Sequence, residues 1–179
     1  MSQATHSFAG RLIALIESHA EQLTRTTVEK LQNNPRTKSY RALSSRDLHG
    51  KAYAIYHDLG CWLLEETETA IQSRYNELGE QRFKERIPLE EVLWAMVLTK
   101  RHLRNYLAVW APADSAVELY RQRELDHLID RFFDRAMVYT TEGYERMRAE
   151  TRKGDVEASA REEPASVAHR GETRTGWVL

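Results

Sequence analysis

The stretch that decides the fold is residues 86–110, RIPLEEVLWAMVLTKRHLRNYLAVW. Its apolar residues recur at the three-to-four-residue spacing of an amphipathic helix. Pro88 suits the first turn of that helix, where its missing N–H costs nothing, and Glu90 and Glu91 then lie near the positive end of the helix dipole. We therefore predict a helix from about Pro88 to Trp110, buried at the centre of a helical bundle.

The same stretch contains two polar side chains one turn apart, His102 and Tyr106. Together with Leu98 they lie in line on a second, fairly apolar face of the helix, and this line is a candidate ligand pocket. One interpretation is that His102 completes the packing through a hydrogen bond to Tyr106 or to a backbone group. The alternative is a haem or small-ligand sensor, since a histidine on a late helix facing an apolar cavity is how a globin holds haem iron. We favour the packing interpretation.

The overall composition favours helices and excludes several classes of function. The chain has 179 residues, which suits one domain, and it combines 30% charged residues with few glycines and prolines. Its 26 basic and 27 acidic residues balance, so it has no footprint for nucleic acid or an anionic membrane. The longest unbroken apolar run covers residues 92–98, far short of the roughly 20 residues of a membrane span. With a single cysteine, Cys61, and no signal-peptide pattern, we expect a soluble cytoplasmic protein.

The remaining helices follow from the same periodicity. We predict them at residues 8–32, 46–65, 67–85 and about 115–149, where the second and third could also form one bent helix. The expected fold class is all-α, a bundle of about five to six helices with a long C-terminal helix. That last helix has an apolar stripe from Val117 to Phe133. Residues 1–150 form the helical domain, and residues 151–179, rich in Gly, Ser, Ala and charges without a period, are predicted to be a disordered tail.

The chain contains none of the patterns that carry catalysis or metal binding. There is no Gly-x-Ser-x-Gly turn and no Gly-rich phosphate loop, and Cys61 has no evident base beside it, so we predict no catalytic residues and no enzyme. His57 with Cys61, and Glu124 with His127, are isolated pairs at helical spacing. Because a metal ion needs three or four ligands, we predict no metal site.

Three segments resemble one known family. They are Tyr75-Asn-Glu-Leu-Gly-Glu-Gln-Arg82, Arg86-Ile-Pro-Leu-Glu-Glu-Val-Leu-Trp-Ala95 and Arg101-His-Leu-Arg-Asn-Tyr-Leu107. Together with Phe132-Phe133-Asp134 and Gly143-Tyr144-Glu145, they resemble the N-terminal domain of RsbT co-antagonist proteins of the RsbRD type, over roughly residues 8–149.

The resemblance implies a globin-like domain that usually binds no haem. It also implies a sensory or dimerising input module of bacterial stress signalling, which acts by protein–protein interaction and is usually fused to an output domain. We expect a homodimer, with a regulatory protein as a possible further partner and no bound cofactor, and a structural adaptor without a switch remains an alternative. The candidate dimer residues lie on the long last helix, whose apolar stripe is broad enough for both core and seam: Phe132, Phe133, Met137 and Tyr144.

Overall fold

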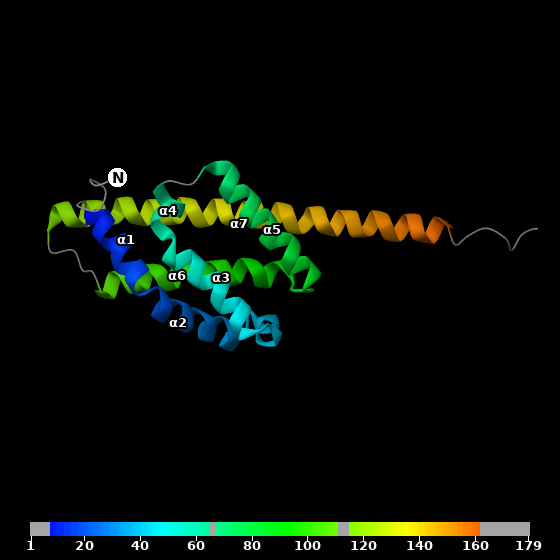
Figure 1. Cartoon of the computed structure of the whole chain (residues 1–179), viewed down its shortest axis with the longest axis horizontal. Helices are drawn as coiled ribbons and strands as arrows, with labels where there is room; N and C mark the ends of the chain where they lie inside the picture. The colour runs from blue at the N-terminus through cyan, green and yellow to red at the C-terminus, as the bar shows by residue number, and fades with distance from the viewer. Residues whose placement is uncertain (1–7, 65–66, 111–114, 162–179) are drawn as a thin grey trace, which may run out of the picture.

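The structure of the chain is a computed structural model that describes residues 8–64, 67–110 and 115–161. Over these residues it contains seven α-helices and one 3-10 helix, with no strand. They are α1 (Phe8–Ser18), α2 (Ala20–Asn33), η2 (Lys38–Ala42), α3 (Ser45–His57), α4 (Leu59–Leu64), α5 (Glu68–Lys84), α6 (Leu89–Trp110) and α7 (Ala116–Arg161). Figure 1 shows them as one bundle built along α7, and the predicted all-α class is confirmed. None of the described helices combines the length and apolar character that crossing a bilayer requires.

Two of the predicted helices are divided, so the described residues hold seven α-helices where five to six were expected. Between α1 and α2, His19 leaves helical geometry with φ −110° and ψ 16°, and its Nδ1 donates to the Leu15 carbonyl at 2.9 Å. Between α3 and α4, Asp58 also leaves helical geometry, with φ −103° and ψ 20°. The first bend directs α1 toward α4 and α7, whereas α2 packs on α3 and α6. Each bend therefore gives one predicted helix two different sets of neighbours.

Buried apolar side chains form two clusters, and α6 takes part in both. The larger includes Ile16, Tyr56, Leu59, Ile71, Leu103, Leu107, Leu125, Ile129, Phe132 and Phe133. The smaller contains Val28, Leu31, Tyr40, Leu48, Ile87, Val92 and Ala95. Because the first turns of α6 lie in the smaller cluster and its later turns in the larger, α6 is the central helix that its sequence predicted.

The start of α6 is fixed by a buried carboxylate. Glu91 is only 7% exposed, and it accepts hydrogen bonds from Ser39 N at 2.7 Å and from Ser39 Oγ at 3.1 Å. A buried charge is tolerated only where such bonds replace water. Glu91 thus ties η2 to α6, a role beyond the helix-dipole contact that its position in the sequence suggested.

Helices α5 and α7 cross in close contact. A Cβ atom added at Gly79 would lie 2.0 Å from the Thr140 carbonyl oxygen, and one added at Gly143 would lie 2.1 Å from the Asn76 carbonyl oxygen. Each glycine therefore accepts the backbone of the opposite helix where any other residue would clash. Thr140 is fully buried at this crossing, so the two helices meet backbone to backbone without intervening side chains.

The last helix differs from its prediction at both ends. Helix α7 has 46 residues, about 69 Å at 1.5 Å per residue, and its C-terminal part extends beyond the rest of the bundle (Figure 1). It continues to Arg161, so residues 151–161 are helical and their assignment to a disordered tail is wrong, while residues 162–179 lie outside the described residues. At the other end Val117 is 62% exposed, so the buried stripe begins later, at Leu125.

Candidate functional site

A cavity of about 280 Å³ lies between α2 and α6. It is lined by Gln22, Leu23, Thr26 and Lys30 from α2, and by His102, Asn105, Tyr106, Val109 and Trp110 from α6. Within each helix these residues are spaced so that they share one face, and the cavity is therefore the gap between two helix faces. The structure places His102 and Tyr106 together in the wall of this cavity, and their role in binding a ligand stays a prediction. Leu98 packs against the smaller core cluster instead, so its place in the predicted pocket is wrong.

A hydrogen bond across the cavity joins the two helices. Lys30 Nζ donates to His102 Nδ1 at 2.7 Å. Since a lysine ammonium can only donate, Nδ1 must accept, and the neutral imidazole carries its proton on Nε2. Burial, reinforced by the positive charge of Lys30, lowers the pKa of His102 to about 4. At neutral pH the ring is therefore uncharged, with its one lone pair already engaged by Lys30.

Behind this bond are two buried polar atoms without a hydrogen-bond partner in the described part of the chain, His102 Nε2 and the Tyr106 hydroxyl. The predicted hydrogen bond between His102 and Tyr106 is thus not formed. Burial raises the pKa of Tyr106, whose ring lies 6.0 Å from that of His19. Both orphaned atoms are covered by protein, so a molecule in the cavity reaches them only if a side chain rotates.

The arrangement does not fit a haem iron. An iron ligand must present a free lone pair, whereas His102 Nδ1 accepts from Lys30 and Nε2 carries the proton. The cavity beside it falls just below the roughly 300–1,000 Å³ of ordinary small-ligand sites. A second cavity of about 70 Å³, lined by residues such as Leu48, Met96 and Phe133, has no histidine or cysteine in its wall.

The α2 half of the site could not be predicted directly from the sequence. Gln22, Thr26 and Lys30 recur every four residues and form a polar line beside Leu23 on the apolar stripe. That spacing places them on one face of a helix but does not reveal which helix they will meet. In the sequence these residues appear only as a polar line along the margin of an apolar stripe. Polar residues that face solvent show the same pattern.

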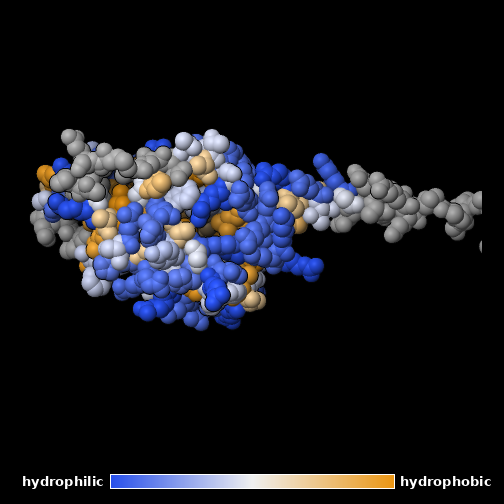
Figure 2. Space-filling view, viewed as in Figure 1, coloured by the Kyte–Doolittle hydropathy of each residue, from blue (hydrophilic) through white to orange (hydrophobic). Residues whose placement is uncertain are grey.

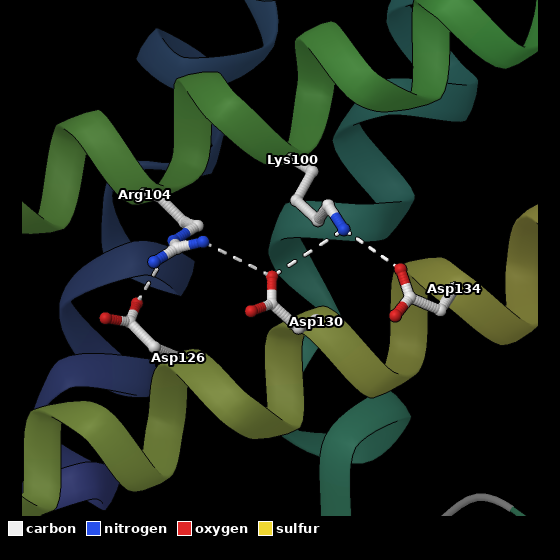
Figure 3. Close-up of polar contacts among 5 residues, drawn as sticks. All are labelled: Lys100, Arg104, Asp126, Asp130 and Asp134. Carbon is white, nitrogen blue, oxygen red and sulfur yellow. Dashed lines mark hydrogen bonds and ion pairs between the residues drawn. The ribbon is translucent and has the colours of Figure 1, made fainter.

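A ladder of ion pairs joins α6 to α7 beside the site (Figure 3). Lys100 Nζ lies 3.6 Å from Asp130 and 3.0 Å from Asp134, and Arg104 lies 3.6 Å from Asp126 and 3.5 Å from Asp130. Asp130 is shared between both cations, which suits two antiparallel helices with charges one turn apart. These aspartates therefore pair α7 with α6.

The residues predicted to form a dimer interface are used within the chain. Phe132 and Phe133 are at most 1% exposed in the core, so their assignment to an interface is wrong. Met137 packs against the same core cluster. Tyr144 donates from its hydroxyl to the Ile87 carbonyl at 2.9 Å and packs edge-on against Phe83. The inward face of α7 is therefore occupied by its own chain.

Exposed apolar side chains gather elsewhere, where α6 ends and α7 begins. We call this set the apolar end: Val109 (73% exposed), Trp110 (61%), Val117 (62%), Leu119 (47%) and Tyr120 (64%). The left side of Figure 2 shows apolar surface at the end of the molecule where α1, α6 and α7 meet. Val138 is the other large apolar side chain exposed among the described residues, and it stands far along α7. Val109 and Trp110 also line the cavity, so the apolar end and the cavity share a wall.

Comparison with known proteins identifies the type of fold and the family. The fold is similar to that of the globin domain of the E. coli DosC in its ferrous form II, with a TM-score of 0.60 and 17% sequence identity over 78% of this chain and 91% of that one. At that identity the likeness shows the globin-like fold alone. No curated protein matches the chain. Residues 21–159 match the sequence model of the RsbT co-antagonist protein rsbRD N-terminal domain, and the chain belongs to that family, as its sequence suggested.

Proposed function

We propose that this chain is a non-enzymatic input module of bacterial stress signalling that acts through protein–protein contact in the cytoplasm. Membership of the RsbRD N-terminal family supports a regulatory role, and the cavity between α2 and α6 supplies a place where a signal can bind. The observation that carries the proposal is the apolar end, which shares Val109 and Trp110 with that cavity. A change inside the cavity can therefore alter a surface suited to a partner.

The partner that we propose for the apolar end is a second copy of the chain. Five large apolar side chains exposed over two adjoining helix ends are unusual for a surface that faces only water. Helix α6 and the start of α7 carry them together, and a two-fold arrangement of two such ends would bury the apolar set of each copy against the other. This replaces the core residues Phe132 and Phe133 as the candidate interface.

The test is the mass of the protein in solution, measured by analytical ultracentrifugation over a range of concentrations. We expect the wild type to dimerise and Val117→Glu to weaken the dimer at least about tenfold, because a charge is placed in an apolar contact. Val117 lies in the first turn of α7, where a carboxylate does not harm the helix.

Val138→Glu is the matched control, since it makes the same change at an exposed valine of the same helix, outside the apolar end. It should dimerise as the wild type does. A wild-type protein that stays monomeric at every concentration would refute the dimer. Dissociation by Val138→Glu but not by Val117→Glu would place the interface farther along α7.

A small-ligand sensor remains the second candidate function, and the cavity is the observation that favours it. Haem is not the ligand that we propose, because the lone pair of His102 is engaged by Lys30. A structural adaptor without a switch would dimerise in the same way whether or not the cavity is filled.

A further inference from the structure

Within the part of the chain that the structure describes, Lys30 is a cation without an acidic partner. Its ammonium donates to the neutral His102 ring, and no carboxylate of the described residues forms an ion pair with it. An ammonium has three N–H donors, of which His102 takes one. Two donors and a full positive charge therefore remain at one end of the cavity between α2 and α6.

The rest of the cavity wall divides into a polar and an apolar part. Side-chain amides from Gln22 and Asn105 add groups that can donate hydrogen bonds, whereas the Thr26 hydroxyl already donates to the Gln22 carbonyl at 3.1 Å and can only accept. On α6, Tyr106 and Trp110 stack with ring centroids 6.1 Å apart and an interplanar angle of 25°. The ammonium of Lys30 thus suits an anion, whereas the wall formed by Trp110 suits a flat apolar group.

We propose that this cavity binds a small aromatic carboxylate, with its carboxylate on Lys30 and its ring against Trp110. A charge-assisted bond from an ammonium to a carboxylate is stronger than its bond to a neutral imidazole, so the anion gains a better partner for Lys30 than the protein itself provides. The volume of about 280 Å³ suits a molecule of one ring with a short acidic group. This names the class of signal for the proposed sensory function and rests on that function for its biological meaning.

Occupation of the cavity has a consequence at the surface. A ring held against Trp110 contacts a residue of the apolar end, because Val109 and Trp110 belong to both. The ligand therefore covers or reorients part of the surface that we assign to the second copy, and its binding free energy is coupled to dimerisation.

The test is isothermal titration calorimetry of the full chain with three probes at the same pH and ionic strength. Benzoate carries both the ring and the charge, benzamide carries the ring without the charge, and acetate carries the charge without the ring. We expect saturable one-site binding of benzoate, with benzamide and acetate at least about tenfold weaker, the scale of one lost charged hydrogen bond.

Lys30→Gln removes the charge while keeping a donor for His102 Nδ1, and it should weaken benzoate binding by at least about tenfold. Lys30 is exposed on α2, so the variant folds, which circular dichroism checks. Lys38→Gln is the matched control, with the same change of net charge at an exposed lysine of η2 outside the cavity, and it should bind benzoate as the wild type does. Absence of saturable benzoate binding, or equal binding by Lys30→Gln and wild type, overturns the proposal.

Ultracentrifugation with and without saturating benzoate separates this proposal from the proposed function. A dimer that binds no benzoate overturns the ligand class and leaves the interaction module standing. A monomer that binds benzoate through Lys30 supports the ligand class and refutes the dimeric module. A benzoate-dependent change in the dimer dissociation constant supports both.

Discussion

The crossing of α5 with α7 and the gap between α2 and α6 are two opposite ways of placing helices side by side. At the crossing, Gly79 and Gly143 let two backbones touch, and there is no room for even one added carbon atom. At the cavity between α2 and α6 the two faces stand apart, and a hydrogen bond between Lys30 and His102 joins them there. The crossing is therefore closed by backbone, whereas the contact around the cavity depends on one hydrogen bond between side chains.

The strongest way to break the comparison is Gly79→Ala. The new Cβ would meet the Thr140 carbonyl oxygen at 2.0 Å, and backbone cannot move aside as a flexible side chain can. We expect the free energy of unfolding, measured by urea denaturation, to fall by about 3 kcal/mol or more. Gly50→Ala is the control: nothing lies within 4 Å of its added Cβ, and the same change within α3 should raise stability by about 0.5–1 kcal/mol. A loss for Gly79→Ala no greater than 1 kcal/mol would mean that the crossing is not closed.

The ladder between α6 and α7 is intermediate between these two contacts, and Asp130→Asn tests it. Asp130 pairs with Lys100 and Arg104 at once, but each cation keeps a second aspartate, so we expect a loss of about 0.5–1 kcal/mol at low salt. Repeating the urea denaturation in 1 M NaCl, where screening acts over about 3 Å, should shrink the difference. The same loss in both salts would show that Asp130 acts through packing and not through charge.

A further effect is confined to mildly acidic pH and concerns His102. Its pKa of about 4 in the folded chain lies below its ordinary value of 6.5, so between these values the unfolded chain binds a proton that the folded chain does not. The free energy of unfolding should therefore fall as pH drops from about 6.5 toward 4. Above pH 6.5 His102 should cause no such loss, because the ring is neutral in both the folded and the unfolded chain. The measurement is the urea midpoint of wild type and His102→Gln at several pH values, in which the variant should lose less than the wild type between pH 7 and 5. Parallel curves would mean that His102 titrates normally and that Lys30 does not hold it neutral.

Much of the fold could be predicted from local pattern. The 86–110 stretch forms α6, which begins at Leu89 and ends at Trp110 as the prolines and the apolar spacing indicated. Both α5 and the long last helix were also expected close to their observed starts. The missed bend at His19 shows the limit, because the apolar stripe passes through the bend without interruption and only the packing of α1 and α2 against different neighbours reveals it.

Half of the candidate site could be predicted from the sequence. His102 and Tyr106 are polar side chains on an apolar line, which is unusual, and both line the cavity. Lys30, the partner of His102, lies 72 positions away in the sequence, on a helix whose facing neighbour cannot be predicted from periodicity. Periodicity also cannot tell which partner an apolar face meets. Phe132 and Phe133 were therefore predicted at a dimer interface, although they are buried within the chain itself.

The sequence by itself determined which residues share a helix face, because helical spacing is a property of neighbours three and four positions apart. It also pointed to both glycine-containing segments, around Gly79 and Gly143, through the family resemblance. Only the tertiary structure decided that these two glycines meet, that Lys30 reaches His102, and that Val109 and Trp110 stay exposed. The physical reason is that a helix face fixes what a residue can contact along its own chain, whereas its partner is chosen by the packing of all the helices together.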